Sequence, residues 1–177
     1  MNPFKVRNPS NEKVLEIAKG CPLPNVIALV GARDRKGWVD SFVHPGALFW
    51  TLSTMSGVWV PPMQWRVFIC ELGAEAVGTN ISKRKRHPCM LPITYAKRYI
   101  AKDAAVTATM LMNAVDKAAE TKAESPPLLS NTILTAEFAA TYALTGDPLH
   151  AAMVASFAHL SQVPLQQRFN EWFQVRT

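Results

Sequence analysis

Apolar residues in the C-terminal half of the chain recur at steps of three or four, which is the spacing of one face of an α-helix. The longest such stripe starts after Pro92, and it predicts one helix that reaches about Lys122. If this helix is continuous, it is about 45 Å long at about 1.5 Å per residue. Its apolar positions are Ile93, Ala96, Ile100, Ala104, Ala108, Leu111, Val115 and Ala118.

Another helix is predicted after the loop at Ser125-Pro126-Pro127. Asn131 or Thr132 can cap it, because short polar side chains accept hydrogen bonds from the free N–H groups of a first helical turn. We expect the helix to end at Gly146, since glycine readily takes the left-handed conformation common at helix C-termini. Its apolar face carries Leu134, Phe138 and Tyr142.

Two more helices complete the C-terminal part. We expect Asp147 to cap the first, with Pro148 at its first position, and Pro164 to open the second. The apolar stripe of the first is Leu149, Met153, Phe157 and Leu160, and that of the second is Leu165, Phe169, Trp172 and Phe173. Residues 92–177 are therefore the clearest helical part of the chain.

The N-terminal half gives weaker signals. Helices are predicted from Asn8 to Lys19, in Ala47–Met55 and in Met63–Val77. Gly73 weakens the last of these assignments, because glycine is a poor helix former. Val26–Val30 is a short apolar run, which periodicity alone cannot assign to a helix or a strand.

We therefore predict a mainly α fold, a helical bundle with a partly irregular or extended N-terminal half. At 177 residues, the chain is expected to form a single domain over residues 1–177, with residues 1–8 as a flexible arm. Hydrophobic residues make up 49% of the chain and charged residues 18%, which is typical of a folded globule and not of a disordered chain.

Several compartments are disfavoured by the sequence. No apolar run reaches the roughly 20 residues that a membrane-spanning helix needs, and the first residues lack the apolar stretch of a secretory signal. Cys21, Cys70 and Cys89 are odd in number and widely spaced, so a disulfide framework is not expected. We expect an intracellular, reduced protein.

Basic residues are concentrated in one segment. Seven of the 19 Lys and Arg residues lie between Lys83 and Lys102, and no acidic residue interrupts them. Because these seven exceed the net charge of +6, the rest of the chain sums to −1. The positive charge is therefore a local feature, which indicates a polyanionic partner. The seven are Lys83, Arg84, Lys85, Arg86, Lys97, Arg98 and Lys102.

The first four of these cations lie between two helical patterns and are predicted in a loop. The other three are predicted on a solvent-facing side of the long helix, beside that loop. Such a surface can neutralise phosphates with little sequence specificity, and Tyr95 or Tyr99 could stack on bases. Single-stranded nucleic acid is the partner class that we favour.

Other interpretations of the basic segment remain open. It could be a solvated charged loop, and Lys83–Arg86 also has the composition of a nuclear-import signal. An anionic membrane surface is a further alternative, less favoured because no hydrophobic anchor helix accompanies the cations.

The remaining candidate chemistry favours structural explanations. His87 and Cys89 are close together, but a structural zinc site needs four ligands and the other His and Cys residues are scattered. Glu71 and Glu75 are one helical turn apart, and with no partner His or Arg nearby we interpret them as solvated charges. We expect no enzymatic activity, no metal and no cofactor. Trp38, Trp50, Trp59 and Trp65 are expected in the core or in a subunit interface.

Two segments resemble viral coat proteins. Phe68–Val77 resembles a segment in the coat proteins of rod-shaped plant RNA viruses. Lys97–Asn113, followed by Glu137–Ala140, resembles the order of elements in flexuous filamentous coat proteins, where an Arg-bearing helix lines the RNA groove and a Phe-Ala helix follows. In that family an acidic residue soon follows the Phe-Ala segment, whereas Thr141 and Tyr142 stand here. The resemblance implies an all-helical subunit that binds single-stranded RNA and polymerises.

Charge and resemblance together predict a viral coat or nucleocapsid protein, found in the virion and host cytoplasm, that packages RNA non-specifically. The seven cations would contact phosphates, and Tyr99 or Tyr95 would stack on bases. The arm Met1–Asn8 and the aromatic region Trp38–Trp65 would supply contacts between copies. The alternative is a viral matrix or accessory protein whose basic segment binds an anionic membrane or the nuclear-import machinery.

Overall fold

The chain is helical in each range that the structure describes. The computed structural model describes residues 11–23, 45–81, 88–122 and 126–173, where it contains no strand. This confirms the prediction of a mainly α helical bundle. In the N-terminal half the described ranges hold helices joined by turns, such as residues 55–61 between two helices, whereas Val26–Val30 and the arm 1–8 lie outside the described residues. The helices are α1 (Asn11–Ala18), α4 (Pro45–Thr54), α5 (Pro62–Asn80), α6 (Met90–Ile100), α7 (Ala108–Lys122), α8 (Pro127–Thr145), α9 (Pro148–Leu160) and α10 (Leu165–Phe173).

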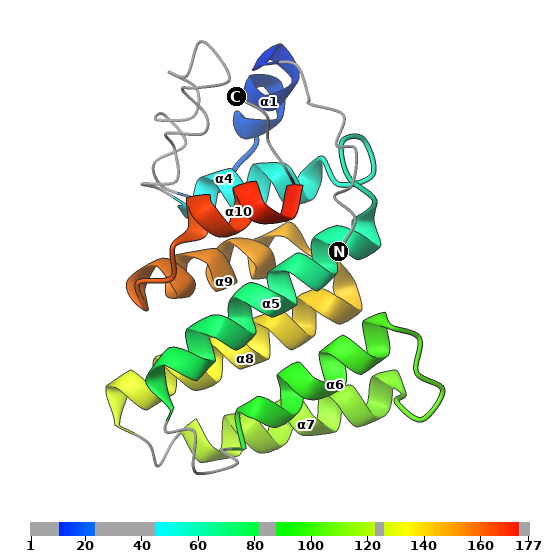
Figure 1. Ribbon diagram of the computed structural model, residues 1–177, viewed down its shortest axis with the longest axis vertical. Coiled ribbons are helices and arrows are strands. Elements are labelled where there is room, and N and C mark those ends of the chain that lie inside the picture. The colour runs from blue at the N-terminus through cyan, green and yellow to red at the C-terminus, as the bar shows by residue number, and fades with distance from the viewer. Residues whose placement is uncertain (1–10, 24–44, 82–87, 123–125, 174–177) are drawn as a thin grey trace.

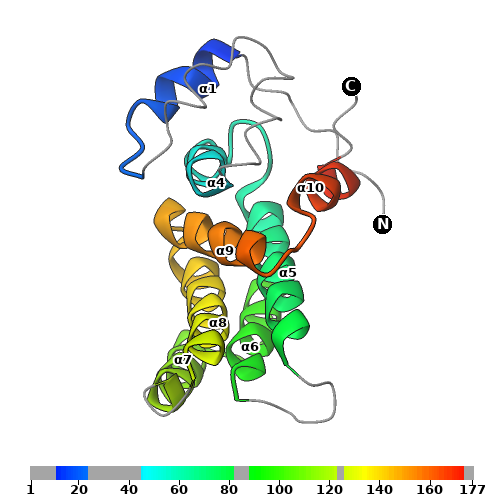
Figure 2. The same ribbon diagram turned by 90° about the vertical axis from the view of Figure 1, so that its left-hand side faces the viewer.

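The helices are stacked in layers along the longest axis of the molecule (Figure 1). At one end, α1 packs on α4, and α10 contacts α9. Helix α9 crosses beneath α4 and rests on α5 and α8, which lie side by side. At the opposite end, α6 and α7 form a pair that packs against α8, as Figure 2 shows from the side.

All eight described helices contribute side chains to one hydrophobic core. Its centre is a group of aromatic rings, with centroids 4.9 Å apart for Phe68 and Phe173 and 5.4 Å apart for Trp59 and Trp65. The indole N–H of Trp65 donates to Ser53 Oγ at 2.6 Å, so its polar atom is satisfied inside the core. Burial of Trp59 and Trp65 confirms that they are core residues and corrects the expectation that these two rings contact another copy.

Gly73 lies in the contact between α5 and α8. A Cβ at this position would be 2.8 Å from the Cβ of Ala139, which is closer than van der Waals contact allows. The missing side chain therefore lets the two helices approach, and tertiary packing outweighs the poor helix propensity of glycine. The helix predicted for Met63–Val77 is confirmed, and it extends from Pro62 to Asn80.

The predicted long helix from Pro92 to Lys122 is wrong. It is interrupted after Ile100, and α7 turns back against α6. Lys102 takes a left-handed conformation (φ 58°), and the N–H of Asp103 donates to the carbonyl of Arg98 at 3.0 Å, which is the hydrogen-bond pattern of a Schellman cap. The interruption was missed because a lysine occupies the position where glycine would have indicated a stop.

The predicted start of the next helix is also wrong, whereas its end is confirmed. Helix α8 begins at Pro127, so neither Asn131 nor Thr132 caps it, and Thr132 is buried. Proline suits this position because it has no N–H that needs a partner in the first turn. Gly146 ends α8 in the left-handed conformation (φ 66°), and Asp147 Oδ1 accepts a hydrogen bond from the N–H of Leu149, as predicted.

Helix α9 buries a different face from the one predicted. Leu149 and Leu160 were expected in the core, but they are 40% and 71% exposed. Small residues face inward instead, because α4, α5 and α8 all pack on this short helix and leave no room for large side chains. The inward face is Ala151, Ala152, Val154, Ala155 and Ala158. In α10 the predicted stripe is confirmed, with Leu165, Phe169 and Phe173 buried.

Candidate nucleic-acid interface

The predicted phosphate-binding residues that the structure describes lie at the C-terminal end of α6. Lys97 and Arg98 occupy the last turn of this helix, and Lys102 follows it. Lys83–Arg86 lie outside the described residues. That they lie beside the cations of α6 therefore stays a prediction.

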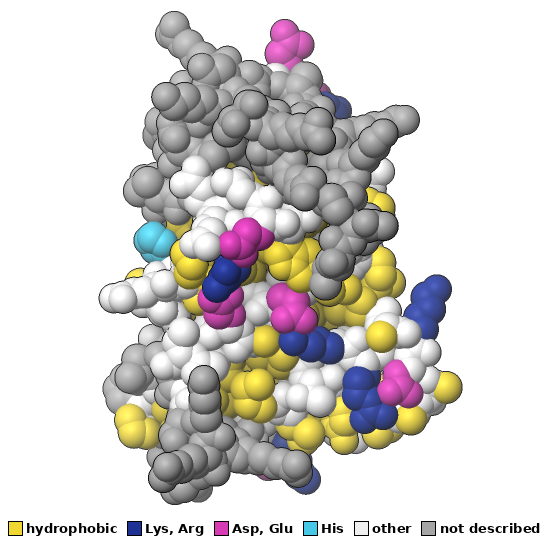
Figure 3. Space-filling model, in the orientation of Figure 1, with side chains coloured by type: hydrophobic (Ala, Val, Ile, Leu, Met, Phe, Trp, Pro, Cys, Tyr) yellow, Lys and Arg dark blue, Asp and Glu magenta, His cyan; other side chains and the backbone are white. Residues whose placement is uncertain are grey.

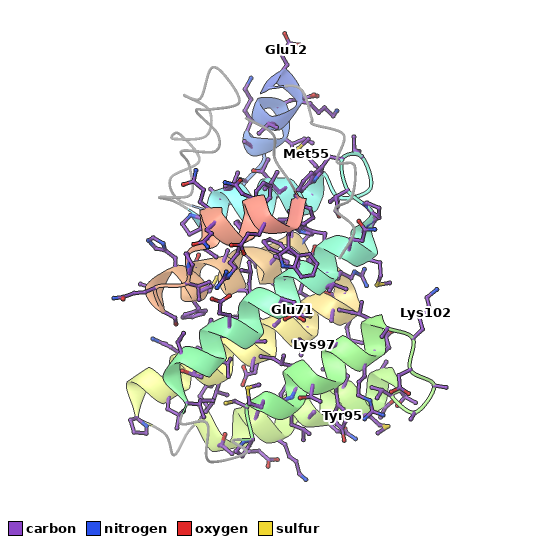
Figure 4. All side chains as sticks on the ribbon, viewed as in Figure 1. Glu12, Met55, Glu71, Tyr95, Lys97 and Lys102 are labelled. Carbon is purple, nitrogen blue, oxygen red and sulfur yellow. The ribbon has the colours of Figure 1, made fainter. Side chains whose placement is uncertain are left out.

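Lys97 is held by a carboxylate of the neighbouring helix. Its Nζ lies 2.8 Å from Oε1 of Glu71 on α5, and both side chains are partly exposed (Figure 4). Glu71 therefore has a lysine partner, whereas the sequence-based interpretation considered only His and Arg. An ion pair at this degree of exposure contributes little to stability, typically about 0–1 kcal/mol.

Arg98 is held by the turn that ends its own helix. Its Nε donates to Oδ2 of Asp103 at 2.7 Å, while Oδ1 of Asp103 accepts the N–H of Ala105 at 2.9 Å. The hydrogen bond from Ala105, followed by that from Arg98, lowers the pKa of Asp103. Asp103 therefore joins the end of α6 to the turn that follows it.

Lys102 differs from the other two cations. Its side chain is exposed, and no ion-pair partner for it occurs among the described residues. Its left-handed backbone points it away from the helix end, as Figure 4 shows. Of the predicted phosphate-binding residues that the structure describes, Lys102 is the most accessible to an anion.

The described residues carry almost no net charge. Within the four described ranges, nine Lys and Arg residues stand against ten Asp and Glu residues, which leaves −1. Since the whole chain carries +6, the segments outside those ranges carry +7. On the face shown in Figure 3, most Lys and Arg side chains of the described residues lie next to Asp or Glu side chains.

The two tyrosines are only partly accessible. Tyr95 and Tyr99 are half-buried and pack against a second, smaller core cluster. This cluster joins α6 to α5, α7 and α8, and its buried members are Cys70, Ala96, Ile100, Leu111, Val115, Ala140 and Ala143. Each ring can therefore offer an edge or part of one face to a ligand, and base stacking stays a prediction.

A groove of about 560 Å³ lies between α6 and α7, and the sequence did not reveal it. It exists because the α6–α7 turn brings together residues that a continuous helix would separate. Tyr95 and Met110 line it, and its polar rim carries two carboxylates and one ammonium group. The net negative charge of this rim does not favour the binding of phosphate. The full lining is Leu91, Tyr95, Met110, Asn113, Ala114, Asp116, Lys117 and Glu120.

A second ion-pair network joins the C-terminal helix to α5. Arg168 donates from Nε and Nη2 to the two carboxylate oxygens of Glu75, at 2.8 and 2.9 Å, and from Nη1 to Glu171 at 3.0 Å. The expectation that Glu75 is an unpartnered solvated charge is thus wrong. The hydrogen bond to Glu75 is the main cause that raises the pKa of Arg168. This network fixes α10 over the aromatic core.

Two cysteine thiols of the described residues are unreactive. Cys70 and Cys89 are buried, and burial raises the pKa of their thiols to about 12 and about 11, which keeps them protonated and unreactive. No group of three or more His, Cys, Asp or Glu residues in the described ranges could hold a metal ion. Across the same ranges, no helix is both long and apolar enough to cross a membrane.

Comparison with known protein families, with curated proteins and with solved structures finds no match. Functional inference therefore depends on the charges, contacts and exposed residues of this chain.

Proposed function

We propose that the protein is a viral coat or nucleocapsid subunit that binds single-stranded RNA without sequence specificity and assembles with other copies. The supporting observation is the concentration of seven of the 19 Lys and Arg residues between Lys83 and Lys102, with no acidic residue among them. Clustered cations of this kind are typical of segments that bind nucleic acid. The densest part of the cluster is Lys83–Arg86.

RNA binding would use Lys97, Arg98 and Lys102 at the C-terminal end of α6, together with Lys83–Arg86, which precede this helix in the sequence. The exposed part of Tyr99 would contact a base beside the cations of α6.

Assembly is expected to depend on the nucleic acid. Copies that each carry +6 repel one another, and phosphates would neutralise that charge. Contacts between copies would come from the arm Met1–Asn8 and from exposed apolar side chains such as Val58, Met63 and Leu160. The proposed location is the virion and the host cytoplasm. Because Lys83–Arg86 also has the composition of a nuclear-import signal, the same cations could direct the protein to the nucleus.

The test is the salt dependence of RNA binding, measured by fluorescence anisotropy with a labelled single-stranded RNA of 20 nucleotides. Each phosphate contact contributes about 0.7 to the slope of log K against log salt for a single strand. Replacing Lys97, Arg98 and Lys102 by Ala should lower the slope by up to about 2. The quadruple Ala variant of Lys83–Arg86 should lower it by up to about 3.

A matched control removes three cations elsewhere, with Ala at Lys13, Lys19 and Lys117, so that the change in net charge is the same. The proposal predicts that the control keeps the slope of the unchanged protein. Equal slopes for all variants, or binding to vesicles with phosphatidylserine but not to RNA, would contradict it and favour a matrix-type protein.

A further inference from the structure

Two of the cations proposed to contact RNA already bind carboxylates of the same chain. Lys97 Nζ lies 2.8 Å from Glu71 Oε1, and Arg98 Nε lies 2.7 Å from Asp103 Oδ2. The four side chains are between 35% and 45% exposed, so a ligand from solvent can reach each pair. The carboxylates come from different elements, Glu71 from α5 and Asp103 from the turn after α6.

These carboxylates occupy the positions that phosphate oxygens would take. A lysine ammonium or an arginine Nε that donates to a carboxylate must release it, or share the hydrogen bond, before it can serve a phosphate. Asp103 cannot readily move aside, because its Oδ1 accepts the N–H of Ala105. For its Nε to donate to a phosphate, Arg98 must therefore leave Asp103.

We propose that Glu71 and Asp103 are internal competitors of RNA phosphates, which lower the affinity of this surface and keep its binding reversible. This inference rests on the proposed function, since it assigns the residues that regulate the same site. An exposed ion pair favours the paired state of its cation by about two- to fivefold. Because only the unpaired cation can bind phosphate, the apparent RNA affinity is multiplied by the fraction of that cation left free. Each pair therefore weakens RNA binding by about two- to fivefold.

The experiment compares two double variants that remove the same number of negative charges. Glu71→Gln with Asp103→Asn neutralises the competitors and preserves their shape, and asparagine still accepts the N–H of Ala105. Asp116→Asn with Glu120→Gln is the control, because these carboxylates lie on α7 and make no ion pair with a described residue. The probe is the same 20-nucleotide RNA in both cases.

The competitor variant should bind RNA about four to 25 times more tightly than the unchanged protein, if the two pairs act independently. Its salt slope should stay close to that of the unchanged protein, because Lys97 and Arg98 contact phosphates in both complexes. The control variant should show a smaller gain and an unchanged slope. Adding Lys97→Ala and Arg98→Ala to the competitor variant should abolish the gain, which a change in folding alone would not explain.

Two results would overturn the inference in different ways. If the unchanged protein binds RNA and the two double variants bind equally, Glu71 and Asp103 are not competitors, while the proposed function stands. If neither the unchanged protein nor any variant binds RNA at about 50 mM salt, where electrostatic binding is strong, both the inference and the proposed function fail. Tighter binding by the competitor variant alone supports both.

Discussion

Replacing Gly73 by alanine tests the close packing of α5 on α8. The new Cβ would lie 2.8 Å from Ala139 Cβ and 3.8 Å from Val154 Cγ1. The Cβ of Ala139 is fixed to the backbone of α8, so relief requires the helices to separate. Such overpacking typically costs about 1–3 kcal/mol, and the better helix propensity of alanine offsets about 1 kcal/mol of it. We expect a net destabilisation of about 1 kcal/mol, with an upper limit of about 2 kcal/mol.

Gly78 provides a matched control on the same helix. A Cβ there meets nothing within 4 Å, so Gly78→Ala should stabilise the protein by about 0.5–1 kcal/mol through helix propensity alone. The two variants thus differ by about 2 kcal/mol, which corresponds to about 4–8 °C in Tm for a chain of this size. Thermal unfolding followed by circular dichroism measures the difference. Equal Tm values would refute the close packing of α5 on α8.

Other predictions concern the turn after α6 and the acid limit of stability. Lys102→Gly should raise stability by about 0.5–1 kcal/mol, because glycine takes the left-handed conformation without the strain of a Cβ, whereas Lys102→Ala should give no such gain in urea unfolding. Asp103 and Glu171 have pKa values below their ordinary 3.8 and 4.5, the first chiefly through the N–H of Ala105 and the second through Gln167. A lowered carboxyl pKa stabilises the folded state above the ordinary value and ceases to do so as pH falls through the folded pKa. Stability should therefore decline below about pH 4.5, and Asp103→Asn with Glu171→Gln should make that decline shallower; an unchanged acid profile would contradict it.

The features of the fold that sequence predicted correctly depend on residues close together in the chain. Gly146 and Asp147 end one helix and start the next through hydrogen bonds that span a few residues, and both were predicted. The α10 stripe was predicted because a single face of that helix meets the core. In such places local pattern and tertiary structure agree.

The errors arise where distant segments decide the structure. Periodicity could not show that α9 is covered by three other helices, which makes its small residues the buried ones. The stop at Lys102 was missed because a lysine, and not a glycine, takes the left-handed position. The ion pair between Arg168 and Glu75 joins residues 93 positions apart, a distance at which no sequence spacing indicates contact.

Part of the candidate site was predictable because it depends on the sequence alone. The concentration of cations between Lys83 and Lys102 is a property of composition, and it was read directly from the sequence. The partners of those cations were not predictable, because Glu71 reaches Lys97 only when α5 and α6 pack together. The groove between α6 and α7 depends likewise on the turn after α6, which the apolar periodicity did not predict.

The most direct test of the central claim is to ask whether the purified protein carries nucleic acid and assembles on it. Size-exclusion chromatography with light scattering and the 260/280 nm absorbance ratio should be measured at low and high salt, before and after ribonuclease. The proposed function predicts large particles rich in nucleic acid at low salt, which ribonuclease or high salt converts to small species. A protein free of nucleic acid, with the same mass under all four conditions, would contradict it.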